Sequence, residues 1–120
     1  MTLEMVQTQT WVRICGYERI EPERGVAALV FDSQIAIFRT FDGALYAVGN
    51  QDPFTGAYVL ARGICGTRGG VPTVASPLHK QVFDLRSGQC LDDESVRIPT
   101  YPVQVVGDVV QVSVGAEAGG

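Results

Sequence analysis

The chain has 120 residues, of which 46% are hydrophobic and 18% are charged, a composition typical of one globular domain. The net charge is −4 and no run of basic residues is present to neutralise phosphates, so we expect no nucleic-acid partner and no membrane partner. The sequence shows no signal-peptide pattern and no apolar stretch of about 18 residues, which leads us to expect a cytoplasmic protein.

Short runs rich in β-branched residues, separated by turn residues, predict an all-β protein. In chain order, strands are expected over residues 10–15, 25–31, 34–39, 44–48, 102–106 and 109–114. The turns expected between paired strands are Asp32-Ser33, Asp42-Gly43 and Gly107-Asp108. Residues 17–20 suit a short turn, and no segment has the 3.6-residue periodicity of a long amphipathic helix.

The middle of the chain, residues 50–77, differs because glycine and proline are frequent there and strand signals are sparse. Two interpretations stay open, a loop-rich insertion and a functional subdomain, since long ordered loops on a rigid scaffold often carry function. Residues 1–9 and 115–120 are expected to be flexible ends.

Catalytic motifs are missing from the sequence. His79 is the single histidine, and no G-x-S-x-G context surrounds a nucleophile that it would activate. Neither a G-x-G-x-x-G nor a Walker A motif is present. We therefore expect no catalytic residue in this chain.

Three cysteines lie far apart in the sequence, Cys15, Cys65 and Cys90, with no C-x-x-C pair among them. We interpret them as small, mostly buried apolar residues. Cys65 lies near Arg62 and Arg68, and an electropositive, partly exposed setting would make it the one candidate redox thiol.

The segment S-P-L-H-K-Q-V-F-D-L-R-S-G-Q-C, residues 76–90, places Ser76 and His79 at the C-x-x-H spacing of metal ligands. An upstream C-x-H pair would fall after the strand at 44–48, where the chain has Asn50 and Asp52. Only the histidine of these four residues has the chemistry of an iron–sulfur ligand.

An all-β chain with C-x-H, a glycine-rich loop, C-P-x-H and F-D-x-x-x-G resembles the Rieske iron–sulfur domain. The resemblance implies one Rieske-like domain over residues 10–114, an antiparallel β-sandwich or barrel whose residues 50–90 form a vestigial cluster-binding subdomain. The ligand positions carried over are Asn50, Asp52, Ser76 and His79. A Rieske centre requires two thiolates and two imidazoles, so we expect no [2Fe–2S] cluster and no metal in this chain.

Three further motifs, D-P-F, S-P-x-x-K-Q and C-L-D-D-E, resemble the small subunit of the NAD(P)H-dependent assimilatory nitrite reductase. The resemblance implies a partner large subunit that carries FAD, sirohaem and an iron–sulfur cluster and reduces nitrite to ammonium. The small subunit then acts by contact and has no active site of its own. Two alternatives remain open: a Rieske-type ferredoxin that carries electrons, and a stand-alone binding module on the same scaffold.

Without a cluster, other bonds must hold the two loops together. We expect a charge-assisted hydrogen bond between Asp52 and His79, with Asn50 and Ser76 capping backbone groups of the facing loops.

The Rieske resemblance also implies that partners dock at the loop tips. The candidate interface residues there are Pro53, Phe54, Leu78, His79 and Lys80. Phe54 has two alternative roles, contact with the partner and filling of the volume left by the cluster. The acidic turn at 92–94 is the alternative docking face.

Overall fold

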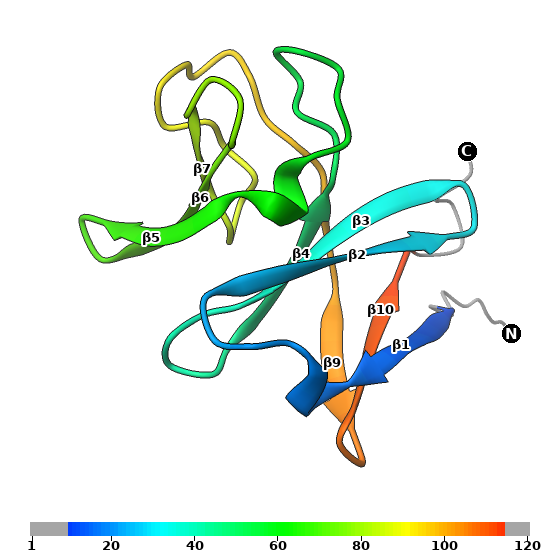
Figure 1. Ribbon diagram of the computed structural model, residues 1–120. Coiled ribbons are helices and arrows are strands. Elements are labelled where there is room, and N and C mark those ends of the chain that lie inside the picture. The colour runs from blue at the N-terminus through cyan, green and yellow to red at the C-terminus, as the bar shows by residue number, and fades with distance from the viewer. Residues whose placement is uncertain (1–9, 115–120) are drawn as a thin grey trace, which may run out of the picture.

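The computed structural model describes residues 10–114, whose strands form three antiparallel sheets (Figure 1). The strands are β1 (Trp11–Gly16), β2 (Arg24–Val30), β3 (Ser33–Arg39), β4 (Leu45–Gly49), β5 (Ile64–Arg68), β6 (Val71–Ala75), β7 (Val82–Asp84), β8 (Thr100–Tyr101), β9 (Val103–Val106) and β10 (Val109–Ser113). Two short 3₁₀ turns accompany them, η2 (Tyr17–Arg19) and η3 (Leu60–Arg62). The expected flexible ends, 1–9 and 115–120, lie outside the described residues. Within 10–114, no helix has the length and apolar character needed to cross a membrane.

The sheets have the strand orders β1-β10-β9, β2-β3-β4-β8 and β5-β6-β7. The prediction of an all-β protein is thereby confirmed, and the six expected strands are found within one residue of their predicted ends. Figure 1 shows the second sheet between the other two. We call the first two sheets the body, and the third sheet with the loops around it the loop end.

Strand β3 forms the centre of the molecule because both of its faces are apolar. Ile35 and Ile37 pack with valines of β10 in the core of the body. Ala36 and Phe38 face the opposite way and pack in the core of the loop end. All four side chains are fully buried, which explains why this strand reads as a continuous apolar run instead of an alternating one.

Two hairpin turns of the body differ in their agreement with the sequence. The Gly107-Asp108 turn is confirmed, and both residues have the positive φ angles, 56° and 69°, of the turn that favours glycine and aspartate. The predicted Asp32-Ser33 turn is wrong by one residue. Val30 pairs with Ser33, so Phe31 and Asp32 connect the strands.

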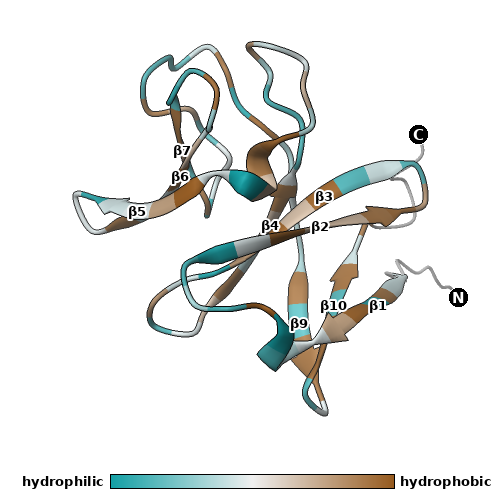
Figure 2. Ribbon diagram, viewed as in Figure 1, coloured by the Kyte–Doolittle hydropathy of each residue, from teal (hydrophilic) through white to brown (hydrophobic). Residues whose placement is uncertain are grey.

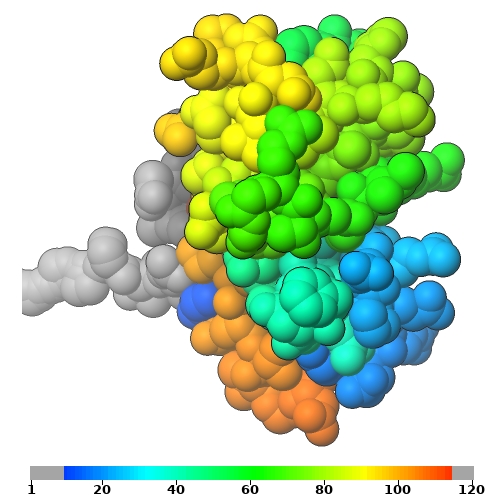
Figure 3. Space-filling model, turned by 90° about the vertical axis from the view of Figure 1, so that its left-hand side faces the viewer, coloured from blue at the N-terminus to red at the C-terminus, as the bar shows by residue number. Residues whose placement is uncertain are grey.

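The glycine-rich middle of the chain, for which the sequence left a loop-rich insertion and a functional subdomain open, contains a β-hairpin as well as loops. Strands β5 and β6 pair through a tight turn at Gly69 and Gly70, whose φ angles are 59° and 81°. Pro72 lies within β6, where a proline lowers the strand signal in the sequence. Figure 3 shows the loop end as an upper lobe of green and yellow segments above the blue and orange strands of the body.

Candidate functional site

Two loops rise at the same end of the molecule, residues 50–59 after β4 and residues 76–81 after β6 (Figure 1). We call them the first loop and the second loop. They hold all four positions carried over from the Rieske ligands. Three of these, Asn50, Asp52 and Ser76, are at most 3% exposed. Buried polar groups need hydrogen-bond partners, so their contacts define the site.

Asp52 is fully buried and joins the two loops. Its Oδ2 accepts a hydrogen bond of 2.5 Å from the Ser76 hydroxyl of the second loop. Its Oδ1 accepts the backbone N–H of Phe54 at 2.8 Å, and its own N–H donates to the carbonyl of Ala57 at 2.8 Å. A carboxylate with hydrogen bonds on both oxygens is a strong cross-link between loops.

The expected bond between Asp52 and His79 is wrong, because Ser76 takes the position next to the carboxylate. His79 lies beyond the bend of the second loop and its side chain is exposed. No hydrogen bond joins Asp52 and His79 in the described part of the chain.

Asn50 caps backbone groups of the segment that follows its own loop, not of the facing loop as predicted. Its Oδ1 accepts the N–H of Ala61 at 2.7 Å, and its carbonyl accepts the N–H of Leu60 at 3.0 Å. Both donors belong to η3. The side-chain amide lies 3.5 Å from Oε1 of Gln34 on β3, at the limit of a hydrogen bond. Asn50 therefore anchors η3 to the end of the second sheet.

Ser76 closes the second loop, so the backbone groups bonded to it lie in its own loop and not in the facing loop as predicted. Its bond to the first loop is the one to the Asp52 carboxylate. Its N–H donates to the carbonyl of Gln81 at 2.9 Å, and its carbonyl accepts the N–H of Lys80 at 3.1 Å. Its Oγ also accepts the N–H of Leu78 at 3.3 Å. Lys80 has a φ of 66°, which lets the chain turn back toward β7.

The four positions do not fit a Rieske cluster. They supply an amide, a carboxylate, a hydroxyl and an imidazole, whereas the cluster needs two thiolates and two imidazoles. The buried three are committed to hydrogen bonds within the protein. Residues 10–114 also contain no group of three or more His, Cys, Asp or Glu side chains arranged to hold a metal ion.

The F-D-x-x-x-G motif, residues 83–88, forms the turn after β7, the strand that follows the second loop. Gly88 donates its N–H to the carbonyl of Asp84 at 2.7 Å and has a φ of 81°. A Cβ at Gly88 would lie 2.0 Å from the carbonyl oxygen of Ile98, so only glycine fits. Partial burial raises the pKa of Asp84, but hydrogen bonds from the side chain and N–H of Arg86 lower it more, leaving it below its ordinary value.

Phe54 packs against the core and is partly exposed, so its contact with a partner stays a prediction. Its ring lies 6.3 Å from the ring of the fully buried Phe83, at an angle of 46°. The side chain is still 37% exposed. One side of the ring therefore covers the core of the loop end and the other faces solvent.

The remaining candidate interface residues are exposed or half-buried at the tips of the two loops. Leu78 is 48% exposed, and Pro53, His79 and Lys80 are exposed as well. The structure thus places an apolar and basic group of side chains at one end of the molecule.

The acidic turn at 92–94 has structural contacts. Asp92 accepts the N–H of Val82 at 2.8 Å and pairs with Arg68 at 3.2 Å. Asp93 accepts the N–H and the hydroxyl of Ser95. The N–H of Val82 and the side chain of Arg68 lower the pKa of Asp92, and the hydrogen bonds from Ser95 lower the pKa of Asp93. Both carboxylates therefore have hydrogen-bond partners within this chain.

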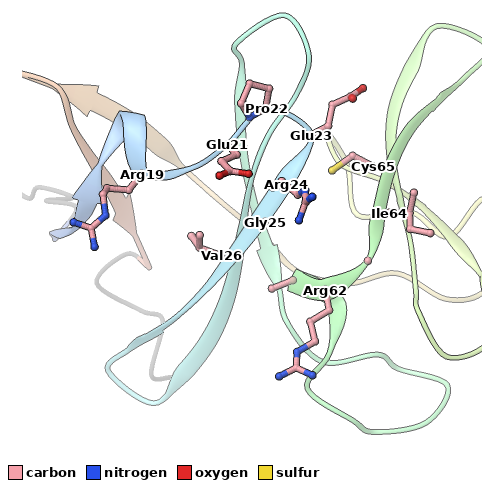
Figure 4. Close-up of a pocket in the computed structure, with 12 residues that line it drawn as sticks. Arg19, Glu21, Pro22, Glu23, Arg24, Gly25, Val26, Arg62, Ile64 and Cys65 are labelled. Atoms are coloured by element: carbon pink, nitrogen blue, oxygen red, sulfur yellow. The ribbon is translucent and has the colours of Figure 1, made fainter.

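The electropositive setting expected for Cys65 is wrong. The thiol lines a cleft of about 710 Å³ between β2 and β5, where Glu23 approaches it from the opposite wall (Figure 4). Burial, and then the charge of Glu23, raise the pKa of Cys65 to about 11. Such a thiol stays protonated and is a poor nucleophile at neutral pH. Cys90 is 1% exposed and Cys15 is half-buried, as expected of apolar cysteines.

Comparisons with known proteins agree with this geometry. The family model of the Rieske-like [2Fe–2S] domain matches residues 10–113. A crystal structure of the putative NADH-dependent nitrite reductase small subunit from Mycobacterium tuberculosis is 49% identical, with a TM-score of 0.86 over 88% of this chain and 96% of that one. The ferredoxin of carbazole 1,9a-dioxygenase from Nocardioides aromaticivorans IC177 is 26% identical, with a TM-score of 0.75 over 86% and 96% of the two chains.

Among curated proteins, the nitrite reductase (NADH) small subunit of Escherichia coli (strain K12) is 43% identical over 85% of this chain and 95% of that protein. The nitrite reductase [NAD(P)H] large subunit of Klebsiella oxytoca is 38% identical over 88% of this chain but only 11% of its own length. With its Rieske-like fold and its similarity to these proteins, the chain belongs to the family of NAD(P)H-dependent nitrite reductase small subunits.

Proposed function

We propose that this chain is a cluster-free accessory small subunit of a cytoplasmic NAD(P)H-dependent nitrite reductase. It acts by contact with a large subunit, which holds FAD, sirohaem and an iron–sulfur cluster and reduces nitrite to ammonium. The observation that carries the proposal is the buried bond between Asp52 and Ser76, which occupies two former ligand positions on an otherwise complete Rieske-like fold. The chain contributes no catalytic residue.

Relatives that combine both parts in one polypeptide support the contact. The Klebsiella oxytoca large subunit contains a segment similar to nearly the whole of this chain. The nitrite reductase [NAD(P)H] of Emericella nidulans contains a similar segment, 36% identical over 61% of this chain and 7% of its own length. A domain that occurs both as a separate chain and inside a larger one favours a stable association between the two parts.

The proposed docking surface is the tips of the two loops. Its residues are Pro53, Phe54, Leu78, His79 and Lys80. Exposed apolar side chains beside a basic residue suit a protein interface whose centre is apolar and whose edge is polar. Leu78 is the best residue to test, because its side chain is 48% exposed and belongs to neither core cluster of the described residues.

The test is a titration of the isolated large subunit with this chain while nitrite-dependent NAD(P)H oxidation is recorded. We expect the activity to rise to a plateau. Leu78→Asp should shift the titration to concentrations about 10-fold higher or more. Ile64→Asp is the matched control, since Ile64 is 65% exposed on β5 and lies outside the loop tips. An activity that is the same with and without this chain would contradict the proposed function.

A Rieske-type electron carrier is the second candidate, favoured by the similarity in fold to the Nocardioides aromaticivorans ferredoxin. It requires a cluster that the four residues at the ligand positions do not fit. In a reductive titration of the isolated chain, uptake of one electron per chain with a change in visible absorbance would identify such a carrier.

A further inference from the structure

The turn between β2 and β3 carries two exposed apolar side chains. Leu29 is 70% exposed and Phe31 is 64% exposed. Between them, Val30 is 1% exposed and packs in the core of the body, so the strand alternates and its outer face is apolar up to the turn. Figure 2 shows the end of β2 in brown beside this turn.

Phe31 also has an unfavourable backbone conformation. Its φ is 54°, in the left-handed region that bulky side chains avoid. Turns of two residues normally place glycine, asparagine or aspartate at such positions. The other two-residue turns do so, with Gly69-Gly70 and Gly107-Asp108. At Phe31 the isolated chain therefore has both an exposed aromatic ring and a strained backbone, a combination that indicates a function at this turn.

The β2–β3 turn continues into the proposed docking surface. A groove of about 330 Å³ is lined by Asp32 of the turn, by Ser33 and Gln34 of β3, and by Pro53 and Tyr58 of the first loop. Gln34 pairs with Leu29 across the hairpin, and its carbonyl accepts the N–H of Asn50 at 3.0 Å. The turn, the groove and the first loop therefore form one continuous surface.

The ends of the described chain lie near the same part of the body. Trp11 pairs with Ser113, which brings the start of β1 and the end of β10 together. Val114 packs in the same core cluster as Val30, the last residue of β2. In the Klebsiella oxytoca relative the polypeptide of the large subunit continues beyond a segment similar to this chain. That relative therefore holds a domain similar to this chain and the remainder of the large subunit in one polypeptide, which supports the large subunit as the occupant of this surface.

We propose that Phe31, with Leu29 beside it, is a second anchor for the large subunit and inserts into an apolar pocket of that partner. The proposal rests on the proposed function and extends its docking surface from the loop tips across the groove to the β2–β3 turn. Burial of an aromatic ring at an interface is typical of residues that dominate binding energy. The strain at Phe31 is retained because the ring is used in the complex.

Phe41 provides a matched control. It is 73% exposed and lies in the β3–β4 turn, at the opposite end of β3 from Phe31. It lines neither loop nor the groove between them. A comparison of Phe31→Asn with Phe41→Asn therefore changes the same side chain at two exposed turns, only one of which adjoins the docking surface.

The experiment measures the dissociation constant of the full chain and the large subunit, together with the melting temperature and sedimentation of each variant alone. We expect Phe31→Asn to weaken binding about 10- to 100-fold and Phe41→Asn to change it less than about 2-fold. The melting temperature of Phe31→Asn alone should be equal to that of the wild type or higher, because asparagine adopts a positive φ more readily.

Each other outcome overturns the proposal in a distinct way. Unchanged binding by Phe31→Asn, with a wild type that binds, rejects the anchor and leaves the proposed function intact. A wild type that does not bind the large subunit rejects both. A lower melting temperature of monomeric Phe31→Asn shows that the chain's own ends cover the ring. A wild-type dimer that Phe31→Asn dissociates assigns the ring to a second copy.

Discussion

The body and the loop end are held together by different forces. The core cluster of the body consists of aliphatic side chains: Ile20, Val30, Ile35, Ile37, Ala47, Val110, Val112 and Val114. The loop end has an apolar core too, but its two loops depend on the buried polar residues Asn50, Asp52 and Ser76. Apolar burial is non-directional, whereas hydrogen bonds need particular atoms at particular positions. The comparison teaches that two long loops can be held in a fixed arrangement by a few directional bonds between buried polar groups.

The largest expected effect compares two glycines, one from each region. Gly88→Ala at the loop end should lower the free energy of unfolding by about 3–5 kcal/mol, since the added Cβ meets the backbone of Ile98 at a positive φ. Gly107→Ala in the body has the same kind of φ but open space around it, and should cost about 1 kcal/mol. Urea denaturation of both variants measures the difference. Equal losses would show that the tight contact at Gly88 is not a constraint.

The second prediction concerns the bond that replaces the ligands. Asp52→Ala should lower the free energy of unfolding by about 2–4 kcal/mol, because it leaves a buried hydroxyl and a backbone N–H without an acceptor. Ser76→Ala should cost about 1–3 kcal/mol by leaving the carboxylate without its donor. The double variant should lose less than the sum of the two, as residues in direct contact do. Strict additivity in a double-mutant cycle would mean that the two side chains do not interact.

A smaller effect is expected from pH. The N–H of Val82 and the side chain of Arg68 lower the pKa of Asp92 below the ordinary value of 3.8, and the contacts of Asp84 with Arg86 act in the same direction. A carboxyl whose pKa is lower in the folded state stabilises the fold at pH values above its unfolded-state pKa. This stabilisation is lost as the pH falls through the folded-state pKa. Unfolding measured between pH 7 and about pH 3 should thus show a loss that Asp92→Asn reduces. If the variant had the same pH profile as the wild type, the Asp92 carboxylate would not contribute to the pH dependence of stability.

The smallest expected effect concerns the rate at which the Cys65 thiol is alkylated. Burial and Glu23 raise the pKa of Cys65 to about 11, so its alkylation by iodoacetamide at pH 8 should be slow and should accelerate toward pH 11. Cys15→Ser and Cys90→Ser, made together, isolate the signal of Cys65. Rapid alkylation at pH 7 would contradict the assigned environment and would favour a reactive thiol.

The sequence predicted the body better than the loop end, for a physical reason. Apolar runs such as the one in β3 and turns such as Gly107-Asp108 follow from local periodicity and turn chemistry. Hairpin β5–β6 was missed because Gly66 and Pro72 interrupt its strand pattern. A sequence gives the spacing of residues within one loop, but it does not show which side chain of another loop forms a hydrogen bond with them.

The errors at the candidate site follow from that limit. The four positions were carried over from the Rieske resemblance and their vestigial role stays a prediction, whereas the partner of Asp52 was taken to be His79 instead of Ser76. Phe31 was missed because Asp32-Ser33 is the better turn pair in the sequence, while the structure places the turn one residue earlier. Only the register of β2 and β3 shows that an aromatic residue has the positive φ.

The most direct test of the central claim is the iron content and visible absorbance of the chain, produced in cells with an active iron–sulfur assembly system and purified without oxygen. Hydrogen bonds at the ligand positions predict a colourless protein with less than about 0.1 iron per chain, since those positions lack thiolates. About two irons per chain, with the visible bands of a Rieske centre, would contradict the account.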